Sequence, residues 1–107
     1  MQVLFINNRV EKFLDSLELH TRSKIFRLFE LLEKYGQSVG MPYLKQIDRR
    51  LWELRIHGQQ EVRLFATFSN QLVIILHGFI KKSMRIPWNE LETARQRLKL
   101  VLTIHNV

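Results

Sequence analysis

The sequence predicts an α+β fold, in which a small antiparallel sheet packs on an N-terminal helical hairpin and a C-terminal helix follows. Three patterns predict it: two amphipathic segments with helical spacing between residues 10 and 35, three strand-like segments between residues 51 and 80, and a third helical segment that starts at Pro87. The expected order is β-α-α-β-β-β-α. With 107 residues, 46% of them apolar, the chain is predicted to form one domain, residues 1–107, with its own core.

The N-terminal part predicts one strand and two helices. The apolar residues 3–6 form a short opening strand, and an asparagine after it can cap the next helix. Thr21 is a candidate N-cap for the second helix, and Gly36 supplies its C-terminal stop. A loop is predicted over residues 37–42, because the segment GQSVGMP (36–42) contains two glycines and a proline. The expected buried positions are Val10, Phe13, Leu14 and Leu17 in the first helix and Ile25, Leu28, Phe29, Leu32 and Tyr35 in the second.

The C-terminal part predicts the sheet and a last helix. Residues 51–56 and 62–68 alternate between two faces, whereas residues 72–80 are apolar at nearly every position, as in a central strand covered on both faces. Residues 43–50 lead into the first of these strands. About residues 100–107 are left unassigned. The last helix is expected to bury Trp88, Leu91, Ala94 and Leu98.

Strand register places the candidate site. A five-residue loop over 57–61 pairs Arg55 with Arg63, and a three-residue loop over 69–71 pairs Arg63 with His77. These three side chains then form a row on one face of the sheet, with Lys81 at its end. The opposite face is expected to pack on the helical hairpin through Trp52, Leu54, Leu64 and Leu76.

Such a row of cations would favour a phosphate group. Arginine grips phosphate oxygens with two parallel donors, and fixed charges stabilise the extra charge of a pentacoordinate phosphorus. RNA carries its own nucleophile, the 2′-hydroxyl, so a site without metal needs only positioning, proton transfer and charge. Lys81, Lys82 or His77 could transfer the proton. We expect Arg63→Ala to keep the fold and abolish this chemistry.

Each of these residues also has a structural interpretation. His77 in an apolar strand is compatible with a hydrogen-bonded core histidine. Lys81 and Lys82 are compatible with a charged strand end that blocks edge pairing, and Arg55 with a solvated side chain. Trp52 and Trp88 are expected to anchor the core rather than stack on bases.

Composition and charge bound the class of protein. The sequence has no cysteine, which excludes disulfides and thiolate metal sites, and its four histidines lack metal-ligand spacing, so no metal or cofactor is expected. No apolar run is long enough to cross a bilayer and no signal peptide is recognisable, so we expect a cytoplasmic protein that does not bind a membrane. The net charge is +7, and residues 45–107 hold eleven basic and five acidic residues, which favours a polyanionic partner.

The order LWELR (51–55), VRLF (62–65), LHGFIKK (76–82) and a proline-started helix with ETARQR (92–97) resembles the HigB branch of the RelE/ParE toxin superfamily, including its phage-encoded relatives. The resemblance covers nearly the whole chain. It implies a toxin of a type II toxin–antitoxin system that cleaves mRNA on the ribosome and arrests growth. It also implies a cognate helix-turn-helix antitoxin, which would contact the first two helices or a sheet edge.

The resemblance assigns roles by position. Arg63 matches the arginine that holds the scissile phosphate, Lys81 or Lys82 a second cation, and Arg55 a basic residue of the preceding strand. Glu53 and Trp88 depart from the RelE pattern, because they stand near positions of a lysine and a catalytic tyrosine. The expected catalytic set therefore includes His77. The RNA or ribosome backbone is expected to contact Lys45, Arg49, Arg50 and Arg85.

Two other functions fit the same sequence. ParE-like members of the superfamily poison DNA gyrase and are not nucleases. Little in this sequence excludes that target, although the row of cations on the strands favours RNA. The chain is also compatible with an inert relic that still binds an antitoxin. Codon preference and oligomeric state do not follow from the sequence.

Overall fold

A computed structural model describes residues 1–105 of the protein. Its helices and strands follow the predicted order along the chain, with one additional strand. Over these residues, no helix combines the length and the apolar character that a membrane crossing requires. In chain order the elements are β1 (Gln2–Phe5), α1 (Asn8–Asp15), α2 (Leu19–Tyr35), the 3-10 helix η1 (Gly36–Val39), β2 (Leu44–Asp48), β3 (Leu51–Ile56), β4 (Val62–Ser69), β5 (Leu72–Ile80) and α3 (Trp88–His105).

The five strands form one mixed sheet in the order β1-β5-β4-β3-β2. β1 runs parallel to β5, and the other neighbouring strands are antiparallel. β2 is the additional strand. Its sequence, LKQID, has little apolar periodicity, and only Leu44 in it is fully buried. The predicted α+β fold class is confirmed.

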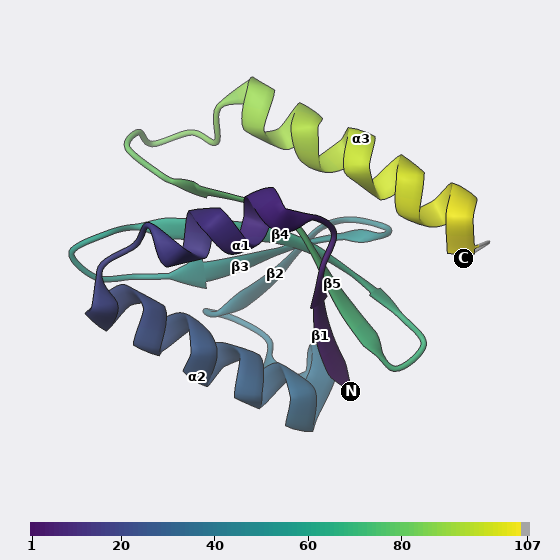
Figure 1. The fold of residues 1–107 in the computed structure, drawn as a ribbon, viewed down its shortest axis with the longest axis horizontal. Coiled ribbons are helices and arrows are strands. Elements are labelled where there is room, and N and C mark those ends of the chain that lie inside the picture. Colours follow the sequence, from purple (N-terminus) through teal and green to yellow (C-terminus); the bar gives the residue numbers. More distant parts are fainter. Residues whose placement is uncertain (106–107) are drawn as a thin grey trace.

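Helices cover both faces of this sheet. Figure 1 shows α2 along one side of the strands and α3 along the other. The core on the side of α1 and α2 joins Leu14, Ile25 and Leu32 to Leu54 and other strand residues. A second core joins α3 to the opposite face through the buried residues Leu51, Phe65, Ile74, Leu76, Phe79, Ala94, Leu98 and Val101. β5 contributes to both cores, which confirms that it is a central strand covered on both faces.

The helix ends follow from specific residues. The Asn7 side chain accepts hydrogen bonds from the backbone N–H groups of Arg9 at 3.0 Å and Val10 at 3.2 Å, as expected of an N-cap. Gly36 ends α2 with a φ of 58°, which a residue with a side chain adopts only with strain. The prediction of Thr21 as an N-cap is wrong: α2 begins two residues earlier, at Leu19, and Thr21 is buried inside it.

The strand register is confirmed for the first hairpin and wrong for the second. Arg55 lies opposite Arg63, as the five-residue loop predicts. β4 and β5, however, are joined by two residues, and a one-residue bulge in β5 shifts the pairing once more, so Arg63 lies opposite Phe79, and His77 lies opposite Phe65. Because the two shifts together amount to two residues, Arg63 and His77 still lie on the same face of the sheet, but they are not paired. Leu76 is an extra residue in the ladder, because Phe65 pairs with His77 and Ala66 pairs with Ile75. This bulge turns Leu76 toward α3, so the prediction that Leu76 packs on the helical hairpin is also wrong.

Two aromatic residues lie elsewhere than predicted. Trp88 is 74% exposed at the start of α3, and Tyr35 is exposed at the end of α2. Trp52 does anchor the core, with its ring 5.4 Å from that of Phe68. Within the unassigned tail, residues up to His105 extend α3, and residues 106–107 lie outside the described part of the chain.

Gly78 permits the close approach of α1 to β5, and we expect Gly78→Ala to destabilise the fold. A Cβ atom there would lie 2.6 Å from Leu64 Cδ2 and 2.7 Å from the Phe13 ring, which are packed core atoms. Overpacking of this kind costs about 1–3 kcal/mol, measurable by urea unfolding. Gly58→Ala is the control, because its Cβ would meet only the end of the Lys24 side chain, with Nζ at 2.9 Å, and this end can move aside at the cost of its hydrogen bond to the His57 carbonyl. We therefore expect a smaller loss, of about 1 kcal/mol at most. Equal effects of the two substitutions would contradict the close packing.

Candidate active site

A histidine–glutamate pair lies in the loop between β3 and β4, at one end of the sheet. His57 Nδ1 is 2.8 Å from Glu61 Oε1, and the Gly58 N–H donates to Glu61 Oε2 at 3.0 Å. The Lys81 N–H donates to the Glu61 carbonyl at 2.7 Å, which brings the end of β5 beside this loop. A proton-transfer group, a carboxylate and a lysine therefore gather at the same end of the sheet.

The Glu61 carboxylate is held in its charged form. Burial raises its pKa, but the Gly58 N–H, the hydrogen bond and charge of His57 and the charge of Arg63 together lower the pKa below the usual 4.5. Glu61 is therefore ionised at neutral pH and can orient the His57 ring through Nδ1. The other ring nitrogen, Nε2, has no hydrogen bond to residues 1–105 and belongs to an exposed side chain.

Behind this pair, two arginines surround a buried carboxylate. The Glu53 side chain is 1% exposed, and its Oε1 accepts a hydrogen bond from Arg55 Nε at 2.9 Å. Arg63 Nε is 4.0 Å from Glu53 Oε2, and Arg63 Nη1 is 3.6 Å from Glu61 Oε1. The Arg63 side chain is 7% exposed, whereas that of Arg55 is 27% exposed.

The predicted row of cations therefore contains its own anions. Glu53 and Glu61 offset the charges of Arg55 and Arg63, so the arginines are stable together without a bound phosphate. Arg63 would reach a phosphate only if Glu61 moved aside, while Arg55 already reaches the surface. Lys81 is half-buried and its Nζ donates to the Met84 carbonyl at 3.1 Å, whereas Lys82 is exposed.

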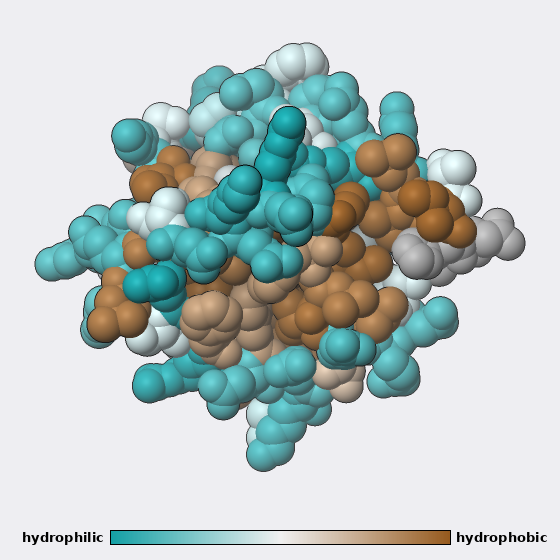
Figure 2. All heavy atoms as spheres, viewed as in Figure 1, coloured by the Kyte–Doolittle hydropathy of each residue, from teal (hydrophilic) through white to brown (hydrophobic). Residues whose placement is uncertain are grey.

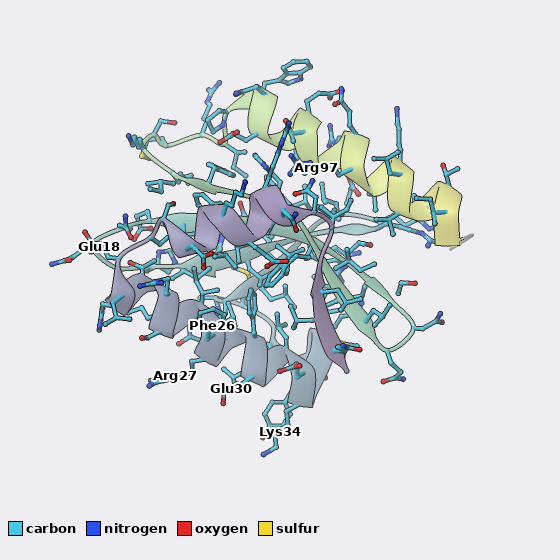
Figure 3. The ribbon with its side chains drawn as sticks, in the orientation of Figure 1. Glu18, Phe26, Arg27, Glu30, Lys34 and Arg97 are labelled. Carbon is cyan, nitrogen blue, oxygen red and sulfur yellow. The ribbon has the colours of Figure 1, made fainter. Side chains whose placement is uncertain are left out.

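A cavity of about 480 Å³ opens beside this cluster. Arg55 and His57 contribute to its wall, together with Lys24 and Arg27 of α2 and the ring of Tyr43. Figure 3 labels Arg27 on α2, the helix that forms one wall. Lys24 Nζ also donates to the His57 carbonyl at 2.7 Å, which fixes the loop to α2. The cavity therefore combines three cations, an imidazole and an aromatic ring.

His77 belongs to a separate network. Its Nε2 is 3.1 Å from Glu90 Oε1, and its Nδ1 is 3.3 Å from Arg97 Nη1. An arginine always donates, so His77 Nδ1 accepts and Nε2 carries the proton that bonds Glu90. Arg97 Nη1 also donates to the Leu76 carbonyl at 2.7 Å. His77 is thus hydrogen-bonded on both nitrogens, away from the His57 loop, which agrees with the structural interpretation.

The residues predicted to bind the RNA backbone are dispersed. Lys45 is exposed on β2 and lies opposite Glu53 in the ladder, near the cluster. Arg49 and Arg50 form the turn before β3, at the end of that strand remote from Arg55, and Arg85 is exposed in the segment before α3. Only Lys45 therefore lies near the candidate active site.

Sequence reasoning missed His57 and Glu61 as a pair. It considered His57 only as a metal ligand and placed both residues in the loop that sets the register. Their spacing was the available signal, since two polar residues at the ends of a five-residue hairpin loop are brought close by the strands on either side.

The fold and the charged sheet end define a small α+β protein with a helical hairpin on one sheet face and a C-terminal helix on the other. Within that class, the chain belongs to the phage-derived Gp49-like protein family (DUF891), whose family model matches residues 12–99. This family is related to the toxins of toxin–antitoxin systems. No curated protein matches the sequence.

Proposed function

We propose that the protein is the toxin of a type II toxin–antitoxin system and acts as a metal-independent endoribonuclease on mRNA at the ribosome. Membership of the Gp49-like family supports a toxin. The observation that carries the nuclease is the cavity of about 480 Å³, in which His57 and Arg55 share one concave surface with further cations and an aromatic ring. Clefts that combine a proton-transfer group with fixed charge are typical of active sites.

In the proposed reaction, the 2′-hydroxyl of a nucleotide attacks the adjacent phosphorus. His57 Nε2 accepts the hydroxyl proton, and Glu61 stabilises the resulting imidazolium through Nδ1. The new bond from the 2′-oxygen to phosphorus closes a 2′,3′-cyclic phosphate, while the bond from phosphorus to the 5′-oxygen breaks. The Lys81 ammonium, which donates to the Met84 carbonyl in the resting protein, would turn to the substrate and donate a proton to that leaving oxygen. One proton is then removed and one is supplied.

Charge stabilisation comes from two arginines with different roles. Arg55 is the phosphate-binding cation, because its side chain reaches the surface beside His57. Arg63 is a positioning residue in the resting protein, because it is buried beside Glu53 and Glu61, at 4.0 Å and 3.6 Å, and its charge stabilises both carboxylates without a hydrogen bond to either. Lys24 and Arg27 would hold the neighbouring phosphates, and the exposed Tyr43 ring would stack on a base.

For the antitoxin, the sheet edge at β1 is the surface we favour. Figure 2 shows apolar surface in the half of the view where Figure 1 places β1, β5 and the C-terminal part of α3. A groove of about 310 Å³ lies there, with Leu4, Leu100 and Ile104 exposed along it. Within the described part of the chain β1 pairs only with β5, so an extended antitoxin segment could add to its other edge and cover the apolar residues.

Mapping of RNA 5′ ends after induced expression tests the nuclease. For the wild type we expect new 5′ ends within coding frames and growth arrest. We expect Glu61→Gln to lower the frequency of these ends by about a hundredfold and to relieve the growth arrest, because His57 loses its orienting charge. Glu33→Gln, an exposed position on α2, is the matched control and should behave like the wild type.

The same induction separates the other functions. Double-strand DNA breaks and an SOS response without new RNA ends would show that the protein acts as a ParE-like gyrase poison and not as a nuclease. Free growth without either signal would identify an inert antitoxin-binding relic. Unchanged RNA ends in Glu61→Gln would remove the His57–Glu61 pair from the mechanism.

A further inference from the structure

A second, smaller cavity lies at the opposite edge of the sheet from His57. Its volume is about 190 Å³, and its wall is formed by Arg9, Val10 and Phe13 of α1, His77 and Gly78 of β5, and Arg97 of α3. β1 pairs with β5 only as far as Ile75, so the ladder leaves room beyond that residue. Figure 3 shows Arg97 between α3 and α1.

The cavity gathers positive charge without a carboxylate partner. Within residues 1–105, neither the Arg9 nor the Arg97 guanidinium lies within 4.0 Å of an acidic side chain. Burial lowers the pKa of Arg97, and the nearby charge of Arg9 lowers it further. Glu90 is the acid of this region, and it already accepts from His77 Nε2. Two cations here repel each other, and a bound anion would relieve that repulsion.

The donors and the size of the cavity define the anion. The Arg97 guanidinium uses Nη1 for the Leu76 carbonyl and His77 Nδ1, and no bond within the described residues uses its other two nitrogens or the guanidinium of Arg9. A volume of 190 Å³ holds about six waters at about 30 Å³ each, which suffices for a tetrahedral oxyanion with part of its hydration. Two guanidiniums match a phosphate in charge and in fork geometry better than a single carboxylate.

We infer that the cavity between α1, β5 and α3 is a phosphate-binding site built from Arg9 and Arg97. It lies on the other sheet edge from the candidate active site and is independent of the proposed nuclease activity. Phe13 and Val10 form its apolar wall, where charge-assisted hydrogen bonds are stronger than in water. The phosphate group can belong to a nucleic-acid backbone or to inorganic phosphate, since both present the same oxygens.

Titration of the full chain with inorganic phosphate, followed by NMR of the Arg97 Nε–H and His77 imidazole signals, tests the site. Sodium chloride at equal ionic strength separates binding from screening. We expect saturable shifts with phosphate only, and binding about tenfold weaker or more in Arg9→Gln and in Arg97→Gln. Arg9 is exposed, so Arg9→Gln remains informative even if Arg97→Gln disturbs the Leu76 contact.

Arg95→Gln is the matched control, because Arg95 lies on the same helix but pairs with Asp48 at 3.5 Å. The inference is overturned if phosphate leaves the two signals unchanged, or if Arg95→Gln weakens binding as much as Arg9→Gln. A short single-stranded RNA without terminal phosphates identifies the source. Shifts with this RNA support the site and assign it to a backbone phosphodiester, whereas shifts with inorganic phosphate alone support the site and assign it to a free or terminal phosphate.

Discussion

Replacing Arg63 by alanine is expected to lower the free energy of unfolding by about 3 kcal/mol, because it leaves a buried carboxylate short of a partner. Glu53 is 1% exposed, and Arg63 Nε lies 4.0 Å from its Oε2. Arg55 still bonds Oε1 at 2.9 Å, which keeps the loss at the lower end of the range for a broken buried pair. Urea unfolding of the purified variant measures it. The sequence alone predicts an intact fold for this variant, and burial of the arginine changes that expectation.

A second variant separates the charge effect from lost packing. Removing both charges, as in Glu53→Gln with Arg63→Met, is expected to recover at least about 1 kcal/mol, because no buried carboxylate remains and the glutamine amide oxygen can still accept from the partly exposed Arg55. The surface control is Arg95→Ala, whose side chain is 46% exposed, and its loss is expected to stay under about 1 kcal/mol. If the Arg63→Ala protein is as stable as the wild type, Arg63 does not stabilise the charge of Glu53. The Arg63 guanidinium of the wild type would then be available to bind a phosphate directly.

The parts of the fold that could be predicted are those set by local pattern. The strong periodicity of α1 and α2, the apolar run of β5 and the loop between β3 and β4 each determine their own element. The pairing of Arg55 with Arg63 follows from the parity of one loop. Burial of Ala94 and Leu98 likewise follows from helical spacing.

What could not be predicted depends on contacts between elements. The bulge at Leu76 has no local signal, because residues 72–76, which lead up to it, are all apolar and fit either face. Trp88 is predicted to be buried because it is a large aromatic residue. It is, however, the first residue of α3, does not belong to the core between α3 and the sheet, and is exposed. β2 is bound through its backbone to β3 rather than through an apolar face, so its side chains do not reveal it.

The candidate site shows the same division. Arg55, Arg63 and Lys81 were recognisable because cations at strand positions stand out from their apolar neighbours. Their acidic partners were not recognisable, since Glu53 and Glu61 act only through distances that the folded chain sets. A charge count along the sequence therefore predicts an open cationic face, whereas the folded chain holds a nearly neutral cluster with one partly exposed arginine beside a histidine.

Replacing His57 by alanine is expected to have the largest effect on activity. If His57 Nε2 removes the 2′-hydroxyl proton, its loss lowers the cleavage rate by about 10²–10⁴-fold while substrate binding changes little. The loop should keep its conformation, because the Gly58 N–H and the Lys81 N–H still hold Glu61. Single-turnover cleavage of a ribosome-bound mRNA measures the rate, and urea unfolding verifies the fold.

His20→Ala is the matched control for this loss, since His20 is exposed on α2 and its side chain has no hydrogen bond or ion pair with the loop that carries His57 among the described residues. The pH dependence adds a second test. Because the Glu61 pKa is lowered, its charge persists to below pH 4.5, and Glu61 alone should not limit the reaction above that value. A wild-type rate that falls well above pH 4.5 would show that a group other than Glu61 sets the acidic limb, and the same limb in His57→Ala would show that this group is not His57. If His57→Ala cleaves at the wild-type rate, the general base is a residue outside this pair. Lys81 would then be the next residue to replace, because its backbone adjoins Glu61.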